Sequence, residues 1–167
     1  MMAQDCKSKF NLDSLIDAMP VTKGSFYSHF KNRSDFLLAL VEYWDRHDTK
    51  SVIAVLDELP ESLSAEEKLW ELTLTINDFK LNRYELLIRT LEFEHPETQS
   101  AIEKVDRRRI DTLRELFSEI GFSGTELEVR TRVYVTTISQ ENTILHKVPE
   151  EDLLDFRRAR HEFFIKP

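Results

Sequence analysis

The sequence contains three Gly among 167 residues, and this scarcity limits the folds that it can adopt. Sheets with many tight turns need residues that accept positive φ angles, and Gly is the residue most often used there. Long helices joined by short loops need few such residues. Pro20, Pro60, Pro96 and Pro149 fall between apolar stretches, where they can separate helices. The composition therefore predicts an all-α fold.

Charge is unevenly distributed along the chain. The net charge of −8 by itself argues against binding to nucleic acid. Residues 1–33 contain five Lys or Arg and three Asp or Glu, a balance of +2, whereas the remainder has a balance of −10. A surface that faces phosphate groups is therefore expected only near the basic end of the chain.

Cysteine content and hydropathy indicate a cytoplasmic protein. Cys6 is the single cysteine, so the chain cannot form an internal disulfide. We see no secretory leader and no apolar run approaching twenty residues, so we expect neither export nor a membrane span. Cys6 has no reactive motif around it, and we interpret it as a thiol near a frayed terminus.

Apolar residues recur at helical spacing through most of the chain, and capping residues separate the stretches. Ser34 is a candidate N-cap of a long helix that ends before Pro60, and Ser64 with Glu67 forms a candidate capping box for the next helix. Gly121 is a candidate C-terminal cap. The predicted helices cover residues 11–19, 22–30, 34–59, 64–79, 83–94, 97–120, about twenty residues from position 124, and a last segment after position 149.

The same periodicity separates inner from outer helix faces. In the run of three arginines at 107–109, Arg109 shares the apolar stripe of its helix and is expected to point inward, whereas the other two are expected to face solvent. In the helix at 64–79, the residues expected to face the core are Leu69, Thr73, Ile76 and Phe79.

The stretch VTKGSFYSHFKNRSDFLLAL, residues 21–40, has the composition of a helix-turn-helix that docks on a DNA duplex. Two short predicted helices flank Pro20, and the second would enter the major groove. Gly24 lacks a side chain, so the backbone could come close to a phosphate or a base edge. The candidate DNA contacts are Thr22, Lys23, Gly24, Ser25, Tyr27, His29 and Lys31.

Two aromatic residues of this stretch are expected to face the protein interior. Phe26 and Phe30 lie four residues apart, so they share a helix face opposite to the candidate contacts. We expect them to hold the second helix against the first, where the apolar partners are Leu12, Leu15 and Ile16.

The segment VTKGSFYSHFKNRSDFLLALVEYW closely resembles the recognition helix and the following helix of the TetR family of transcriptional regulators. In that family a pattern V-[ST]-x-G-[ST]-[FL]-Y-x-[HY]-F-x-[ND]-[KR]-x-[DE]-L is typical. The resemblance implies that Thr22, Lys23, Ser25 and Tyr27 face DNA and that Gly24 permits close approach. It also implies that His29 contacts the DNA backbone and that Lys31 is the lysine that opens the next helix. It also implies a repressor that binds a near-palindromic operator as a dimer.

The sequence departs from the TetR pattern at two places. The family has a helix of several turns ahead of the helix-turn-helix, but ten residues precede Asn11 here, so this helix is expected to be short or missing. Pro20 stands where the family usually has Gly or Asn, and its fixed φ excludes the positive φ that those residues allow. A weakened DNA contact is the expectation that follows from both departures.

The resemblance divides the chain into a helix-turn-helix region at 1–45 and a helical ligand-binding and dimerisation domain at 46–167. It implies a pocket for a small-molecule effector between the middle helices and a homodimer through the last two helices. The sequence does not identify the effector. Candidates to line the pocket are Trp70, Phe79, Phe93, Arg109 and Tyr134, although each of them also fits a plain core position.

Other functions receive little support from the sequence. GFSG at 121–124 lacks the spacing of a nucleophile elbow, and no Gly-rich phosphate loop is present, so we expect neither enzyme activity nor a bound cofactor. Glu92, Glu94 and His95 form the one acid–histidine cluster, which is typical of a solvated helix end, so we expect no metal site. The alternative that remains open is a helical dimeric ligand-sensing or interaction protein that has lost DNA binding.

Overall fold

The computed structural model describes residues 22–141 and 148–166. Within these ranges the chain forms helices joined by short turns and contains no β-strand, so the predicted all-α fold is confirmed there. The predicted helix at 11–19, including Leu12, Leu15 and Ile16, lies outside the described residues. The elements are α2 (Lys23–His29), α3 (Arg33–Asp45), η1 (Arg46–Lys50), α4 (Ser51–Glu58), α5 (Ala65–Asp78), η2 (Leu81–Tyr84), α6 (Glu85–Glu94), α7 (Pro96–Ile120), α8 (Gly124–Gln140), η4 (Glu150–Asp152) and α9 (Leu153–Ile165).

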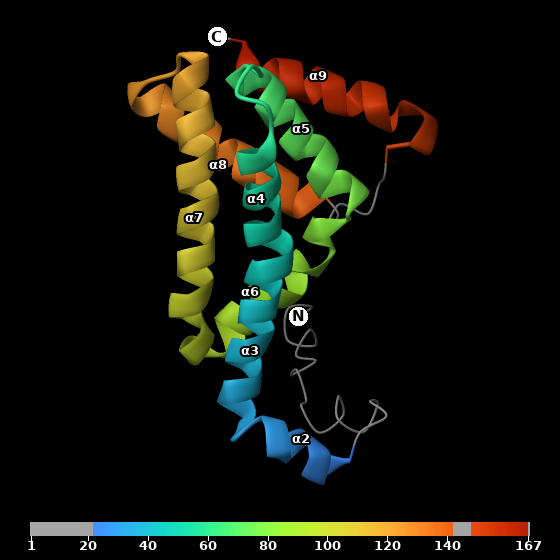
Figure 1. Cartoon of the computed structure of the whole chain (residues 1–167), viewed down its shortest axis with the longest axis vertical. Coiled ribbons are helices and arrows are strands. Elements are labelled where there is room, and N and C mark those ends of the chain that lie inside the picture. Colours follow the sequence, from blue (N-terminus) through green and yellow to red (C-terminus); the bar gives the residue numbers. More distant parts are fainter. Residues whose placement is uncertain (1–21, 142–147, 167) are drawn as a thin grey trace, which may run out of the picture.

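A continuous helical rod runs through α3, η1 and α4 and passes the sequence boundary predicted at residue 45 (Figure 1). Its N-cap is Asn32, whose side-chain oxygen accepts a hydrogen bond from the Asp35 N–H at 2.9 Å. The predicted cap, Ser34, is therefore wrong by two residues, and its hydroxyl instead donates to Glu97. Midway along the rod, η1 is a π-helical turn, which has i→i+5 hydrogen bonds in place of the i→i+4 bonds of an α-helix.

The capping box predicted for α5 is present. The Ser64 hydroxyl accepts from the Glu67 N–H at 3.2 Å, and the Glu67 carboxylate accepts from the Ser64 N–H at 2.8 Å. These bonds satisfy two backbone groups that the first turn of a helix leaves unpaired, and they lower the pKa of Glu67. At the other end of α5, the prediction that Phe79 faces the core is wrong, because Phe79 is the C-cap residue and is 71% exposed.

Helix α7 confirms the predicted role of Gly121 as a terminator and the predicted inward direction of Arg109. Gly121 ends α7 in the left-handed conformation, with φ of 116°, as expected of a C-terminal cap. Arg109, on the same helix, points inward, whereas Arg107 is exposed. Arg108 is half-exposed and pairs with Asp45 at 2.5 Å.

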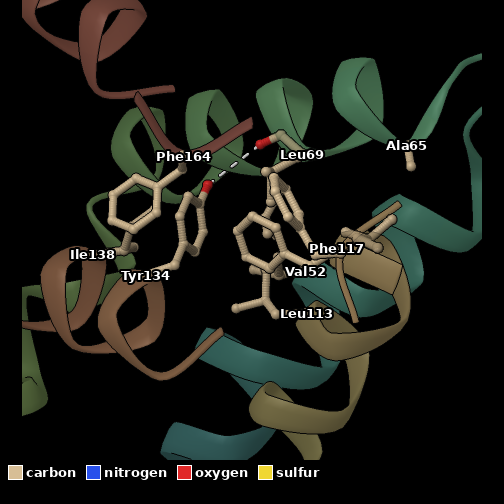
Figure 2. Close-up of a cluster of buried hydrophobic side chains, with 11 residues drawn as sticks. Val52, Ala65, Leu69, Leu113, Phe117, Tyr134, Ile138 and Phe164 are labelled. Carbon is tan, nitrogen blue, oxygen red and sulfur yellow. Dashed lines mark hydrogen bonds between the residues drawn. The ribbon is translucent and has the colours of Figure 1, made fainter. Parts of the chain in front are cut away.

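The larger of two apolar clusters lies among α4, α5, α7, α8 and α9. Figure 2 shows the ring of Tyr134 beside Phe164, with Phe117 on its other side and Leu69 on α5 above. The Tyr134 hydroxyl lies 2.7 Å from the Thr73 hydroxyl, so this buried polar group is satisfied, and burial raises the pKa of Tyr134 to about 12. The second cluster joins α3 to α6 and α7; its buried members are Leu37, Val41, Trp44, Ile88, Leu91, Ile102 and Val105.

No helix within 22–141 and 148–166 has both the length and the apolar character needed to cross a membrane.

Candidate nucleic-acid interface and internal cavity

The short helix α2 and the residues next to its two ends carry the predicted DNA contacts. Thr22, Lys23, Gly24, Ser25, Tyr27, His29 and Lys31 are all exposed. Phe26 is the buried residue of this helix. Its ring lies 5.1 Å from that of Phe30 and 5.2 Å from that of Phe36 on α3, measured between centroids. The aromatic contacts therefore fix the polar face of α2 outward.

Several polar groups of α2 are already used within the helix. Thr22 is the N-cap, and its hydroxyl accepts from the Ser25 N–H at 3.1 Å. The Ser28 hydroxyl donates to the Ser25 carbonyl at 2.7 Å. Such local bonds favour Ser and Thr at helix ends and stabilise the short helix. Lys23, Tyr27 and His29 are the larger exposed side chains of this helix.

Hydrogen bonds between polar side chains connect the start of α3 to the start of α7. The Arg33 guanidinium donates to Nε2 of His95 at 3.2 Å, and the Ser34 hydroxyl donates to the Glu97 carboxylate at 3.0 Å. The Glu97 backbone N–H, followed by the Ser34 hydroxyl, lowers the pKa of Glu97. The turn that follows α2 is therefore attached directly to the helices of the larger part. The sequence predicted a solvated helix end at His95, but its side chain is 13% exposed and contacts Arg33, so that prediction is wrong for His95.

A cavity of about 70 Å³ lies where α4, η1, α5, η2, α6, α7 and α8 meet. Arg109 and Tyr134 line it, as predicted, but the other three candidates do not. Phe79 and Phe93 are 71% and 89% exposed, because they lie at the ends of α5 and α6 and turn away from the bundle. Trp70 packs instead against His161 on α9, with ring centroids 5.3 Å apart.

The walls of the cavity are mostly apolar, but four charged or amide side chains also face it. Its apolar lining includes Val52, Leu56, Leu72, Ile76, Leu113 and Ile138, and its polar lining includes Asp48, Asn82, Glu85 and Arg109. Pockets that bind small molecules usually combine an apolar wall with a few polar groups that orient the ligand. The arrangement therefore has the chemistry of a small ligand site.

Arg109 and Glu85 form a buried ion pair on one wall of the cavity. Their side chains approach to 3.0 Å and are 15% and 1% exposed. The Arg109 guanidinium also donates to the Thr49 hydroxyl at 2.8 Å and stacks on the ring of Trp44. Glu85 in addition accepts from Arg89 at 2.8 Å. Both charges are therefore compensated within the protein.

Asp48, Glu85 and Asn82 were not predicted from the sequence as cavity residues. A signal existed for the two acids, because each interrupts an apolar stripe at helical spacing. Asp48 follows Trp44 by four residues, and Glu85 precedes Ile88 by three. A polar residue on an inner face must find a buried partner or line a cavity.

Metal binding receives no support from the described part of the chain, where no three side chains of His, Cys, Asp or Glu come together in a way that could hold an ion. Glu92 of the predicted acid–histidine cluster pairs with Arg89 at 3.2 Å.

The fold and these two sites describe an all-helical protein with an exposed short helix at one end and a small internal cavity. No protein-family model matches the chain, and no solved structure matches it. A stretch of 40 residues is 45% identical to the transcriptional regulator AcuR of Cereibacter sphaeroides. The match covers 24% of this chain and 18% of the length of that regulator.

Proposed function

We propose that the protein is a TetR-like transcriptional regulator that binds duplex DNA through the outer face of α2. The observation that carries the proposal is the arrangement of α2: Phe26 anchors the helix, and every predicted contact residue is exposed. This face lies in the net-positive part of an otherwise acidic chain. The local similarity to a protein named as a transcriptional regulator supports the same conclusion.

Duplex selection followed by a salt series tests DNA binding. A random-sequence duplex library is enriched on the full chain, and the affinity of the enriched duplex is measured by fluorescence anisotropy between 50 and 200 mM salt (about a fourfold range). Each phosphate contact contributes a slope of about −0.9 in log K against log salt. We expect enrichment of a near-palindrome and a steep slope. No enrichment, with a stable fold, would favour the alternative of a ligand-sensing protein without DNA binding.

We further propose that two copies pair through α8 and α9 and bind the two halves of the operator. A groove of about 780 Å³ between these helices exposes Val129, Val133 and Phe163. Its rims carry both signs of charge, as the ion pairs Arg130–Glu126 and Lys166–Glu162. A two-fold interface must be complementary to itself, and a mixed-charge rim around apolar residues meets that requirement.

The exposed face of α8 is separate from its inward-facing apolar residues. Val135 lines the internal cavity, and Leu127 packs against the core. Val129 and Val133 lie on the opposite face and are exposed. Substitutions at Val135 would therefore perturb the core, and Val133 is the better position for testing the dimer.

The regulator is proposed to act as a repressor that a small-molecule effector releases from DNA. The cavity supports this proposal because its walls include η1 and α4, which continue into α3 without a break. A ligand that favours one packing of this rod shifts the population of orientations available to α2. Repression is tested by measuring transcription of a reporter controlled by the selected duplex, with and without the protein. We expect lower expression when the protein is present.

Alanine at Gly24 is expected to separate DNA binding from stability. A Cβ atom at this position would come no closer than 3.9 Å to the Thr22 hydroxyl oxygen, which is an ordinary contact. The Gly24→Ala variant should therefore be as stable as the wild type, or more stable by up to about 1 kcal/mol. If the α2 backbone approaches the duplex closely, the added methyl group should weaken DNA binding by about tenfold or more. Thermal unfolding and anisotropy measure the two effects, and unchanged DNA affinity would place Gly24 away from the duplex.

Lys31 and Lys23 are expected to differ in their effect on sequence preference. Lys31 lies at the turn after α2, where a phosphate contact is expected, so Lys31→Ala should weaken all duplexes alike and reduce the salt slope by about 1. Lys23 lies in the first turn of α2, nearer the bases, so Lys23→Ala should change the ranking of duplexes. Anisotropy on the selected duplex and on single-base variants distinguishes the two. Uniform losses from both substitutions would contradict this division.

A further inference from the structure

The π-helical turn η1 places an acidic side chain against the internal cavity. Asp48 lies in this turn and lines the cavity beside Val52 and Leu113. Its Oδ2 atom is shielded from water and accepts no hydrogen bond from the described residues. Single π-helical turns within α-helices occur frequently at functional sites. A buried acceptor without a partner is costly unless a ligand or a water molecule satisfies it.

The other charged groups of the cavity are already paired. Arg109 contacts Glu85 and the Thr49 hydroxyl, and Glu85 also accepts from Arg89. Arg109 is therefore poorly placed to capture a carboxylate, because an anionic ligand would have to displace Glu85. Counted together, Asp48, Glu85 and Arg109 leave one negative charge on the cavity wall when the two acids are ionised. A cation would neutralise that charge, whereas an anion would double it.

We propose that the cavity binds a small alkylammonium ion, with the ammonium group on the Asp48 carboxylate and the alkyl chain among Val52, Leu113 and Ile138. The ammonium donates to the Asp48 carboxylate, and the apolar wall takes up the chain. This assignment of the ligand class depends on the proposed function only for its regulatory consequence, release from DNA. Binding itself is independent of that consequence.

The size of the cavity limits the alkyl chain. The cavity of about 70 Å³ is small, so short-chain compounds are the suitable probes. n-Butylammonium and 1-butanol share a butyl chain with a cationic and a neutral head group, and n-butyrate has the same number of carbon atoms with an anionic carboxylate. These three compounds form a matched set of probes.

Isothermal titration calorimetry with the three probes tests the assignment. The proteins are the full-length wild type, Asp48→Asn, and Asp57→Asn as a matched control on the exposed face of α4. We expect n-butylammonium to bind the wild type and the control with equal affinity, 1-butanol to bind more weakly and n-butyrate not to bind. Loss of a hydrogen bond to a charged group should weaken n-butylammonium binding to Asp48→Asn about ten- to hundredfold.

Thermal unfolding of the same variants guards against a simple folding defect. Burial raises the pKa of Asp48 to about 6, against the opposing influence of Arg109. The ionised carboxylate therefore costs stability above pH 6, so Asp48→Asn should melt at or above the wild-type temperature at pH 7.5. A variant that folds well and loses the cation would support the site. Equal binding of n-butyrate, or unchanged n-butylammonium affinity in Asp48→Asn, would overturn it.

A pH series provides an independent measurement. The charged groups that face Asp48 are Arg109 on α7, Glu85 on α6 and Arg83 on η2. An alkylammonium ion keeps its charge below pH 8, as a Lys side chain does with its pKa of about 10.4. Affinity for n-butylammonium should therefore fall as the pH decreases through 6, because Asp48 becomes protonated. Affinity that does not change between pH 7.5 and pH 5 would contradict an ionic contact with Asp48.

DNA binding is measured separately, so the two proposals can fail separately. If n-butylammonium binds but leaves the affinity for the selected duplex unchanged, the ligand class stands and the proposed release mechanism falls. If the protein binds the duplex but not n-butylammonium, the assignment of the ligand class falls and the DNA-binding function stands.

Discussion

Glu85→Gln is expected to lower the free energy of unfolding by about 3 kcal/mol, because it leaves the Arg109 guanidinium without its buried counter-ion. The glutamine keeps nearly the same shape, so the loss reports on charge. Arg89, the other cation on Glu85, retains Asp106 at 2.5 Å and is less affected. Urea unfolding measures the difference, with the midpoint shifted at an unchanged slope if the fold is preserved.

Glu42→Gln is the matched control for this substitution. Glu42 on α3 pairs with Arg46 at 3.2 Å on an exposed face, where both side chains are largely in water. Exposed pairs of this kind contribute about 0.3–0.5 kcal/mol. Equal losses from the two glutamine substitutions would show that the Glu85 carboxylate is far better hydrated than its 1% exposure indicates.

The double substitution Val133→Glu and Phe163→Glu is expected to produce monomers. It should weaken binding to a palindromic duplex by about 10²–10⁴-fold. Both side chains are exposed in the single chain, Phe163 at 74%, so the charges cost little when the subunits are separate. In a dimer they would be buried without partners. A monomer then binds each half of the operator independently and loses the advantage of two linked contacts.

Light scattering with size-exclusion chromatography measures the change in mass, and anisotropy measures the affinity. Thermal unfolding checks that the variant remains folded. Glutamate at Leu86, which is also exposed but lies on α6, provides a control that should leave the mass unchanged. A Val133/Phe163 variant that keeps the mass of a dimer would place the interface elsewhere.

Local chemistry was sufficient to predict much of the fold. The capping box at Ser64, the terminator at Gly121 and the inward direction of Arg109 each depend on residues close in the sequence, and each is confirmed. Phe79 could not be placed in this way. The chain leaves α5 through Lys80, whose φ of 51° is uncommon for a residue other than Gly, and no local signal marks that turn.

On α4 the structure buries Val52 and leaves Ile53 and Leu56 half-buried. The prediction that the outer face of α2 is exposed needed only the spacing of Phe26 from its neighbours. The structure confirms that exposure. The cavity required contacts between distant helices, and three of its five predicted residues lie elsewhere.

The rod from α3 to α4 has a consequence for how motion can pass along the molecule. Each residue of an α-helix turns the chain by about 100° around its axis. The π-helical turn at Arg46–Lys50 holds one more residue per hydrogen-bonded loop than its neighbours do. Rewinding this turn would therefore twist α3 against α4 around their common axis. A local gain or loss of helical winding beside Asp48 would therefore rotate the end of the rod that is connected to α2.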